Sequence, residues 1–350
     1  MKAIRIAIVL AASVAPAAAQ ERVKFEPKFV VNVPFFQQVG TEVEQTITVQ
    51  GGSELKLAHS QTFQFKWLPT KLDGDKWTVE LIIEGMKLKV DIATNQVNYD
   101  SAATPTEAGS GGNNPALGEF FKNLKDTKFL VTVGKGGVIE KVDGRDEFLK
   151  KLGGANPQME GILKKILTDE SLKEMSDPMA GLTVVGDKAV NEKWDKKTNL
   201  PLGPIGSYDR TLTFTYKAKE AVAPGNDNVH KVEVDVQMAY KPPTEAGEGL
   251  LFRIKGGDLK PFNPKPGFFR FDATKGYVKE AKLTVSLKGT LDVALGNNTE
   301  TKVELVQTQT TTLKTQDSTF AVVAGPVPGP GPGAPPIIAP PPMPPMPPKQ

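Results

Sequence analysis

The chain contains no cysteine and only two histidines among its 350 residues. Without cysteine there are no disulfides, no thiolate metal sites and no cysteine nucleophiles. His59 and His230 are far apart in sequence, and neither has a second histidine at the spacing of a metal-binding pair. We therefore expect no metal and no cofactor, and a stability that comes from burial and hydrogen bonding.

An excess of charge of one sign is also missing, since 43 Lys and Arg stand against 40 Asp and Glu. No strong field is available to attract a polyanion, so nucleic acid is not an expected partner. After the first twenty residues no apolar run approaches the roughly 18 residues that a transmembrane helix needs. We therefore do not expect an integral membrane protein.

Local signatures of catalysis are absent as well. The glycine-rich Gly134–Gly137 is too short for a phosphate-binding loop, and no serine stands in a G-x-S-x-G elbow. Carboxylate pairs that hydrolyse glycosides meet in space without a local sequence signature, so a hydrolase stays open as a third hypothesis. The expectation is a protein that is not an enzyme.

The first residues follow the pattern of a cleaved export signal. Lys2 and Arg5 stand at the start of an apolar run, Ile4 to Val14, and Ala17 to Ala19 supply a small-residue exit before Gln20. The pattern predicts a signal peptide over residues 1–19. The mature protein is therefore expected outside the cytoplasm, either periplasmic or secreted.

Strict alternation of apolar and polar residues dominates the rest of the chain. It places one apolar face on each strand, which is typical of an antiparallel sheet with one side in water. The alternation predicts a single large β-rich domain over residues 20–320. The fold class is α+β and mostly antiparallel β, a curved sheet or open barrel of about 10 to 13 strands. Clear examples are Phe63, Phe65 and Trp67; Trp77, Val79, Leu81 and Ile83; Val232, Val234 and Val236; and Leu283, Val285 and Leu287.

The apolar parity changes once within a continuous pattern. It runs on odd positions up to Ile83 and on even positions from Met86 onward, with Gly85 between them. A bulge or a tight turn at that glycine would keep both halves facing the same side.

Helices are expected only in an insert over residues 114–178. Asn114 and Pro115 suit a helix start, and an apolar stripe follows at Leu117, Phe120, Phe121 and Leu124. A short helix is predicted over Arg145–Leu152 and stopped by Gly153, and a longer one from Asn156 with a break near Thr168. Two or three of these helices should pack on the concave face of the sheet.

Two segments lack any such periodicity. Residues 102–114 contain Gly109-Ser110-Gly111-Gly112 and are predicted to form a mobile loop before the first helix. In the tail, 13 of the 25 residues from Pro326 to Gln350 are proline. Residues 321–350 are therefore predicted to be a disordered, extended tail.

An apolar face that short helices cover only in part would leave a cavity for a hydrophobic guest. We expect a non-catalytic exported binding protein for a hydrophobic small molecule or lipid, and the loop at 102–114 would let the first helix move as a lid. The residues expected to line the ligand site are Phe63, Phe65, Trp67, Phe120 and Phe121. Ordinary packing of the helix stripe onto the sheet is the competing interpretation. The alternative function is a structural or adhesive cell-envelope protein that contacts an envelope partner through its surface and its proline-rich tail.

Several turn and strand segments resemble a family of exported bacterial proteins of unknown function. These segments are Phe129–Val133, Val138–Val142 with Asp143-Gly144, Phe148-Leu149, Val185-Gly186-Asp187 to Trp194, and the hairpin from Phe271 to Val278. The resemblance extends over most of residues 40–315 and implies a β-rich fold without assigning catalytic residues. More loosely, strands wrapped around helices resemble the periplasmic lipoprotein-carrier fold, an incomplete antiparallel barrel that holds a lipid.

Overall fold

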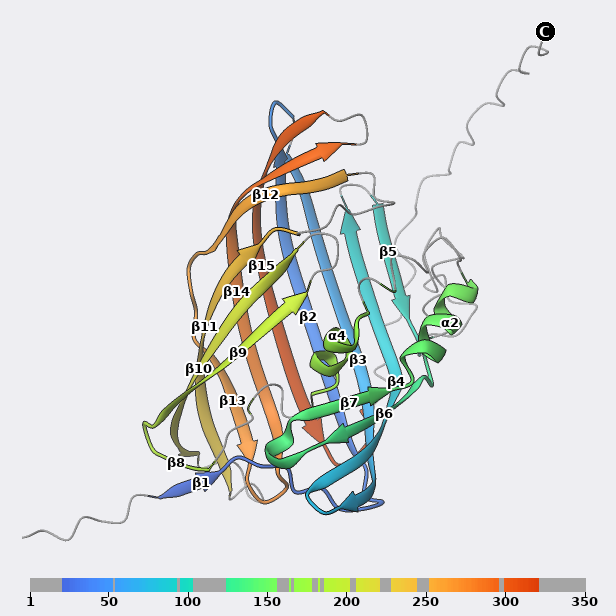
Figure 1. The fold of residues 1–350 in the computed structure, drawn as a ribbon, viewed down its shortest axis with the longest axis vertical. Coiled ribbons are helices and arrows are strands. Elements are labelled where there is room, and N and C mark those ends of the chain that lie inside the picture. Colours follow the sequence, from blue (N-terminus) through green and yellow to red (C-terminus); the bar gives the residue numbers. More distant parts are fainter. Residues whose placement is uncertain are drawn as a thin grey trace, which may run out of the picture. The chain divides into compact units, whose positions relative to one another are not determined.

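Long antiparallel strands make up most of the protein (Figure 1). The computed structural model describes residues 21–52, 54–92, 95–102, 124–155, 164, 167–177, 182, 186–201, 206–220, 228–243, 252–295 and 299–320. All of these belong to one compact unit, Met1–Phe320. The strands are β1 (Arg22–Lys24), β2 (Phe35–Val49), β3 (Glu54–Asp73), β4 (Lys76–Ile92), β5 (Asn95–Asp100), β6 (Lys128–Val133), β7 (Ile139–Asp143), β8 (Asp187–Ala189), β9 (Lys193–Pro201), β10 (Ser207–Glu220), β11 (Val229–Lys241), β12 (Phe252–Pro261), β13 (Gly267–Asp272), β14 (Tyr277–Leu295) and β15 (Glu300–Gln316).

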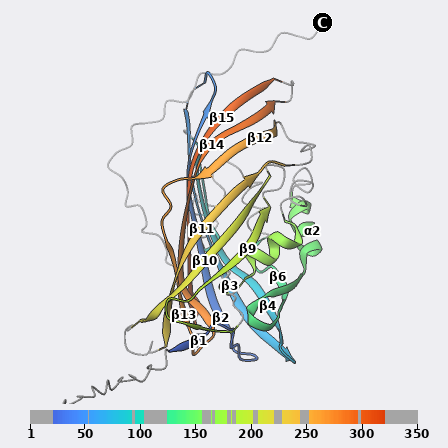
Figure 2. The same ribbon diagram turned by 60° about the vertical axis from the view of Figure 1, so that its left-hand side comes forward.

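Thirteen of these strands form one curved sheet, in the order β7-β6-β4-β3-β2-β15-β14-β13-β11-β10-β9. β5 pairs with β4, β12 pairs with β14, and β1 and β8 form a separate ribbon. Among the described strands the sheet is not closed, because β7 and β9 are the ends of the order and do not pair with each other. In both ribbon views the sheet curves so that β9, β10 and β11 lie opposite β2 and β3 (Figures 1 and 2). The predicted curved, mostly antiparallel sheet is confirmed.

The predicted change of parity near Gly85 is a β-bulge within β4. Gln64 pairs with Gly85 whereas the next residue, Phe65, pairs with Ile83, so Glu84 is the extra residue. The bulge turns Ile83 and Met86 to the same face, and both are buried. A Cβ on Gly85 would lie 2.9 Å from the side-chain oxygen of Gln64 and 3.3 Å from the hydroxyl of Ser101.

Two helices are described, α2 (Arg145–Ala155) and α4 (Asp169–Met175). The predicted stop at Gly153 is wrong, because α2 continues through the glycine pair to Ala155, and a glycine ends a helix only where it leaves the helical conformation. The predicted break near Thr168 is confirmed, since α4 begins at Asp169. The expectation of two or three helices on the concave face is not confirmed. Only α2 and α4 are described as α-helices, α4 has only two turns, and the predicted helix from Asn114 lies outside the described residues.

Helix α4 lies between the two ends of the open sheet (Figure 1). It contacts both β7 and β9. Just after the helix, the carboxylate of Asp177 lies 3.6 Å from the ammonium of Lys196 on β9. The helix therefore bridges a gap that no strand pairing closes. None of the helices within the described ranges is long and apolar enough to cross a membrane.

The apolar side chains of the concave face form three clusters. The first joins β3, β4 and β6 to both helices, for example through Phe129 and Phe148, whose ring centroids are 5.0 Å apart. The second joins β10, β11 and β13 around Phe25. The third, between β14, β15 and the upper parts of β10 and β12, is much smaller and has only four buried members, Tyr208, Leu259, Leu287 and Leu305.

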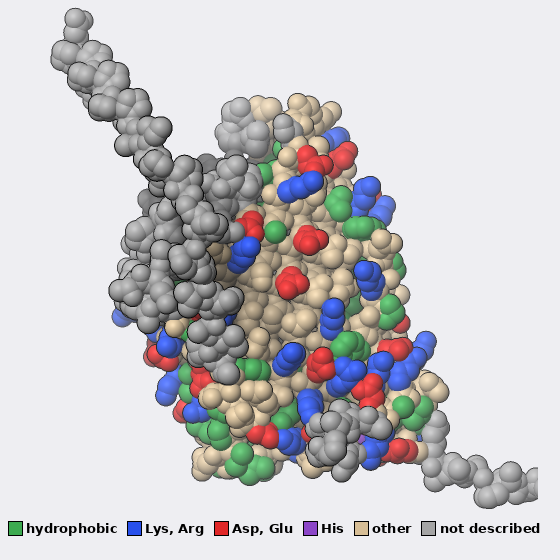
Figure 3. All heavy atoms as spheres, turned by 180° about the vertical axis from the view of Figure 1, so that it is seen from behind, with side chains coloured by type: hydrophobic (Ala, Val, Ile, Leu, Met, Phe, Trp, Pro, Cys, Tyr) green, Lys and Arg blue, Asp and Glu red, His purple; other side chains and the backbone are tan. Residues whose placement is uncertain are grey.

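The opposite face of the sheet is polar. Figure 3 shows acidic and basic side chains scattered over it with few apolar ones between them. Hydroxyl pairs link neighbouring strands there, with Thr284 and Thr310 3.2 Å apart and Ser286 and Thr308 3.0 Å apart. Threonine and serine suit this wet face because they keep β propensity without adding apolar surface.

We predict that Phe25→Ala lowers the free energy of unfolding by about 3–5 kcal/mol, because it removes a fully buried ring and leaves a cavity. The ring of Phe25 contacts those of Trp194, Tyr216 and Phe271 at centroid distances of 5.2–5.6 Å. Urea denaturation followed by tryptophan fluorescence measures the effect. The control, Val30→Ala at a side chain that is 61% exposed, should change the unfolding free energy by less than about 0.5 kcal/mol. Equal losses in the two variants would contradict the prediction.

Candidate functional site

The largest opening described in the apolar face is a cavity of about 590 Å³, here called the upper cavity. Its lining includes all four buried members of the third cluster and comes from β2, β15, β14 and the paired β12, and from β10 and β11. Its lining residues are Gln45, Ile47, Tyr208, Arg210, Met238, Tyr240, Ile254, Leu259, Leu283, Val285, Leu287, Leu291, Val293, Val303, Leu305, Gln307, Gln309 and Thr311.

The upper cavity exists because two strands share one edge of β14. β13 pairs with the lower part of β14, up to Lys282, and β12 pairs with the upper part from Leu287 onward. The chain changes over at Phe262, whose N–H donates to the carbonyl of Ser286, and Asn263 adopts the left-handed φ of 48° that such a corner needs. β13 joins β11 to the lower part of β14, and β11 pairs with β13 only up to Val234. The upper half of β11 is therefore not held next to β14 and can lie further from it.

Alternation in the sequence points the cavity side chains inward. On β14 every second residue from Leu283 to Val293, except Gly289, contributes an apolar side chain, and Met238 and Tyr240 do so on β11. In this cluster five partly buried side chains pack against only four buried ones, whereas buried side chains predominate in the two lower clusters. The face is therefore apolar at this level but not filled.

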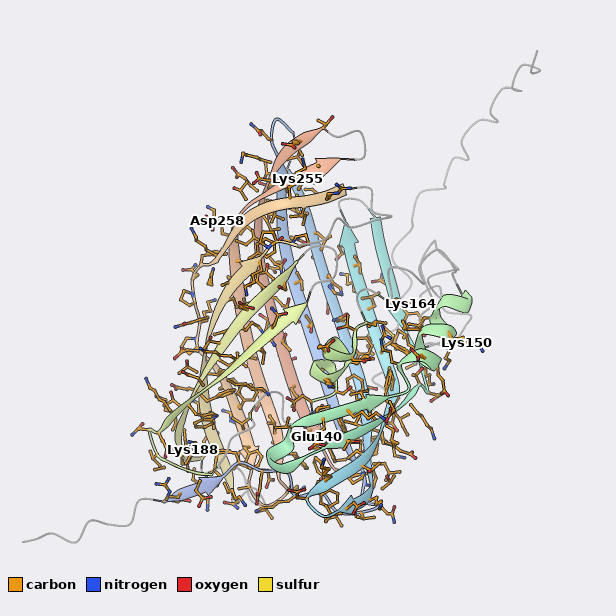
Figure 4. The ribbon with its side chains drawn as sticks, viewed as in Figure 1. Glu140, Lys150, Lys164, Lys188, Lys255 and Asp258 are labelled. Atoms are coloured by element: carbon orange, nitrogen blue, oxygen red, sulfur yellow. The ribbon has the colours of Figure 1, made fainter. Side chains whose placement is uncertain are left out.

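Gly289 brings β12 close to β14. A Cβ at this position would lie 1.8 Å from the carbonyl oxygen of Asp258 on the neighbouring strand, far inside van der Waals contact. Asp258 and Lys255, labelled in Figure 4, mark this strand at the end of the unit opposite to Glu140 and Lys188. The close approach fixes β12 as one wall of the upper cavity.

One side of the upper cavity is polar. Gln307, Gln309 and Thr311 follow one another on the inward face of β15, and Gln45 lies directly opposite Gln307 on β2. Arg210 on β10 carries the single charge among the described lining residues. Burial lowers the pKa of Arg210 to about 10 and raises that of Tyr208 to about 12. At neutral pH the guanidinium is still a cation and the phenol is still protonated.

A second opening of about 280 Å³, the helix cavity, lies between the sheet and the two helices. Phe63 and Phe65 line it together with Phe129, Phe148 and Leu172. Two of the predicted ligand residues are thus brought together at a cavity, although not at the largest one. Their role in binding a ligand stays a prediction.

Trp67 lines neither of these two cavities. Its ring is 1% exposed and stacks on Phe35, with centroids 5.7 Å apart and planes 3° from parallel. The same alternation that places Phe63 and Phe65 at the cavity carries Trp67 further down the strand into the filled core. Phe120 and Phe121, the remaining predicted ligand residues, lie outside the described residues, as do residues 103–114 of the predicted loop and the start of the helix that was expected to move as a lid.

A third opening of about 420 Å³, the junction cavity, lies beside α4. It shares Arg210, Leu283 and Thr311 with the upper cavity, so these three residues stand where the two openings meet. The Nε–H of Arg210 donates to the hydroxyl of Thr198 at 3.1 Å, across a pair of residues in register on β10 and β9.

The sequence did not lead us to predict Arg210, Gln307 or Gln309 as site residues. A signal for Arg210 is present, because it interrupts the apolar series of alternate residues Tyr208, Leu212, Phe214 and Tyr216 on β10. No such signal marks Gln307 and Gln309, since alternate polar residues on a threonine-rich strand look the same on either face. Only the register with β14 assigns them to the cavity.

The remaining candidates for chemistry are structural. The hydroxyl of Tyr216 donates to Nδ1 of His230 at 2.8 Å, and Nε2–H of His230 donates to the side-chain oxygen of Asn228 at 2.9 Å. His230 is 1% exposed and lines none of the three cavities. Within the described part of the chain, no three His, Asp or Glu residues gather in a way that could hold a metal ion.

Comparison with known families adds a partial match. A model described as "Family of unknown function (DUF6263)" matches residues 74–244. The expected resemblance to a β-rich family of unknown function is confirmed over this segment. It is shorter than the expected residues 40–315 and ends before β12, β14 and β15, which build much of the upper cavity. No curated protein matches the chain.

Solved structures give only slight likenesses. A chain from "Lipid-protein interactions in lipovitellin" has a TM-score of 0.42 at 11% identity over 84% of this chain, which spans 26% of the lipovitellin chain. DynF from the dynemicin biosynthesis pathway of Micromonospora chersina has a TM-score of 0.18 at 10% identity, covering 85% of this chain and 86% of its own. Pseudomonas aeruginosa OccK5 (OpdH) has a TM-score of 0.19 at 9% identity, covering 82% and 99%. Similarity at this level assigns no function.

We predict that Gly289→Ala lowers the free energy of unfolding by about 1–3 kcal/mol, because its methyl group forces β12 away from β14. Urea denaturation measures the loss. The matched control is Gly256→Ala on β12, whose new Cβ would meet only the flexible carboxylate of Asp292 at 3.2 Å. The idea fails if Gly289→Ala is as stable as the control.

A second prediction concerns pH. Burial lowers the pKa of His230 below its usual 6.5, outweighing the nearby carboxylates of Glu21 and Asp272, which raise it. The unfolded chain therefore binds the proton more readily, so stability is complete above about pH 6.5 and declines as the pH falls toward the native pKa. Unfolding free energies measured from pH 8 to 5 should show a smaller decline in His230→Gln. His59, whose pKa is also lowered by burial, provides the comparison variant His59→Gln. An unchanged pH profile in His230→Gln would refute the assignment.

Proposed function

We propose that this protein is a non-catalytic exported binding protein for a hydrophobic or lipid-like ligand. The observation that carries the proposal is the upper cavity of about 590 Å³, lined mainly by aliphatic side chains on the concave face. This volume lies within the range of roughly 300–1,000 Å³ that small-molecule sites occupy. The export signal expected over residues 1–19 supports a site of action outside the cytoplasm.

The incomplete burial of the third cluster favours an apolar guest. Ile47, Met238, Val285 and Leu291 pack against this cluster but are only partly buried. Each 100 Å² of their apolar surface that a ligand covers would contribute about 2.5 kcal/mol. A hydrocarbon chain in the upper cavity would cover these partly buried side chains.

The chemistry of the lining supports binding over catalysis. Among its described residues there is no carboxylate, imidazole or thiol to act as a general base or a nucleophile. The phenol of Tyr208 does not replace them, because burial raises its pKa to about 12. Apolar area and a few fixed polar groups are what a carrier needs.

Filling the upper cavity tests the proposal. In the double variant Val285→Phe with Val303→Phe, two neighbouring strands project larger side chains into the opening, which has room for them. We expect the affinity for the neutral fluorophore N-phenyl-1-naphthylamine to fall at least tenfold, with a thermal midpoint at or above that of the unmodified protein. Mass spectrometry of solvent extracts should find lipid with the native protein and less with the double variant.

The control is Val30→Phe, the same change at a side chain that is 61% exposed and lines none of the three cavities. It should bind the fluorophore normally. Absence of both fluorophore binding and co-purified lipid in the unmodified protein would remove the carrier proposal and favour a passive envelope scaffold. Unchanged binding in the filled variant would move the ligand away from the upper cavity.

A further inference from the structure

Arg210 interrupts an otherwise apolar inward row. The neighbours on the same face of β10 are Tyr208, which is 7% exposed, and Leu212, which is 6% exposed. A guanidinium in such a row carries a desolvation cost that an apolar residue would avoid. The hydrogen bond from its Nε–H to Thr198 orients the side chain at the junction of the upper and junction cavities.

The charges around Arg210 differ between the two openings. The described lining of the upper cavity contains no Asp or Glu, so the charge that faces its interior is positive. The junction cavity adds Glu170, Lys173, Asp177 and Lys196, and the last two are paired at 3.6 Å. Arg210 is therefore the one charged group that the described lining of the upper cavity offers to an anion.

Polarity also changes along the length of the upper cavity. In the register of β14 with β15, Leu283 pairs with Thr311 at the junction, Val285 with Gln309 and Leu287 with Gln307. Further up, the β15 residues on this face are Leu305 and Val303, and Val303 pairs with Leu291.

One end of the upper cavity thus offers a guanidinium, amide N–H groups and a hydroxyl. The other end is mainly hydrocarbon, with the ring of Tyr240 beside Gly257, which pairs with Leu291. At about 3.4 Å per residue, the distance along β15 from Thr311 to Val303 is about 27 Å, longer than an extended hexadecanoate.

From this arrangement we infer that the ligand is an amphiphile with an anionic headgroup on a hydrocarbon chain, and that Arg210 binds the headgroup. Thr311 and Gln309, which line the same cavity, supply further hydrogen-bond donors, and the chain extends toward Leu291 and Val293. The inference rests on the proposed function and adds the charge of the ligand and its orientation. Arginine suits this role because its planar fork matches carboxylate and phosphate oxygens, and charge-assisted hydrogen bonds are about twice as strong as neutral ones.

The experiment compares ligands that share one chain and differ in the head. Full-length protein is titrated with hexadecanoate, hexadecyl phosphate and hexadecan-1-ol by displacement of N-phenyl-1-naphthylamine. Arg210→Gln should weaken the binding of the anions at least tenfold and leave hexadecan-1-ol within twofold. The two anions distinguish a carboxylate from a phosphate as the preferred head. The matched control is Arg253→Gln, the same change at an exposed residue on β12 beside the inward Ile254, and it should bind all three ligands normally.

The outcomes separate this inference from the function on which it rests. Equal losses for the alcohol and the anions in Arg210→Gln would show that Arg210 only shapes the wall, and would overturn the inference. Unchanged binding of all three ligands would overturn it too, while the carrier proposal would stand. Failure of the unmodified protein to bind any of the three would remove the proposed function itself. Arg210→Lys keeps the positive charge but lacks the planar donors of the guanidinium. We expect its affinity for the anions to lie between those of Arg210→Gln and the unmodified protein.

Discussion

Backbone pairing along β14 is the constraint on which the rest of this structure depends. One edge of that strand is shared between β12 above and β13 below, so the wall that continues through β13, β11 and β10 cannot follow β14 to its upper end. The upper halves of β10 and β11 consequently stand away from β14 and β15. The upper cavity is the space that this separation leaves.

The same constraint explains why the two ends of the concave face differ. At the lower end, the aromatic rings of Phe25, Trp67 and Phe271 fill the space between the curling strands, and the helices cover the rest. At the upper end no helix is described, and the side chains that reach inward are mostly aliphatic. The unit therefore combines two large buried clusters, beside which the helix and junction cavities lie, with a small cluster around the larger upper cavity on one continuous sheet.

Much of the fold follows from residue patterns. Alternation at Trp77 to Ile83, and its shift at Gly85, predicts both the strand and the bulge that the structure contains, because side chains on a strand repeat every two residues. The hairpins at Gly74 and at Gly134–Gly137 follow from turn-forming residues between such strands. The end of α2 was predicted too early, since Gly153 lowers helix propensity without enforcing a stop.

The candidate site was less predictable. Phe63 and Phe65 reach a cavity as their position on the apolar face implies, but Trp67, which has the same parity, belongs to the filled core. Parity assigns a side chain to a face and says nothing about how far the opposite wall stands from it. Arg210 carried a readable signal as a cation in an apolar row, and Gln307 and Gln309 carried none.

The sequence by itself determined which side of each strand is apolar, where the chain turns, and that cysteine chemistry is absent, because these are local properties of residue type and spacing. Only the tertiary structure decided that two strands share one edge of β14, that the wall separates above that point, and that Arg210 and Thr311 line the same cavity there. Those features depend on pairings between strands that lie far apart in the sequence, such as Gln45 on β2 with Gln307 on β15, which no local pattern encodes.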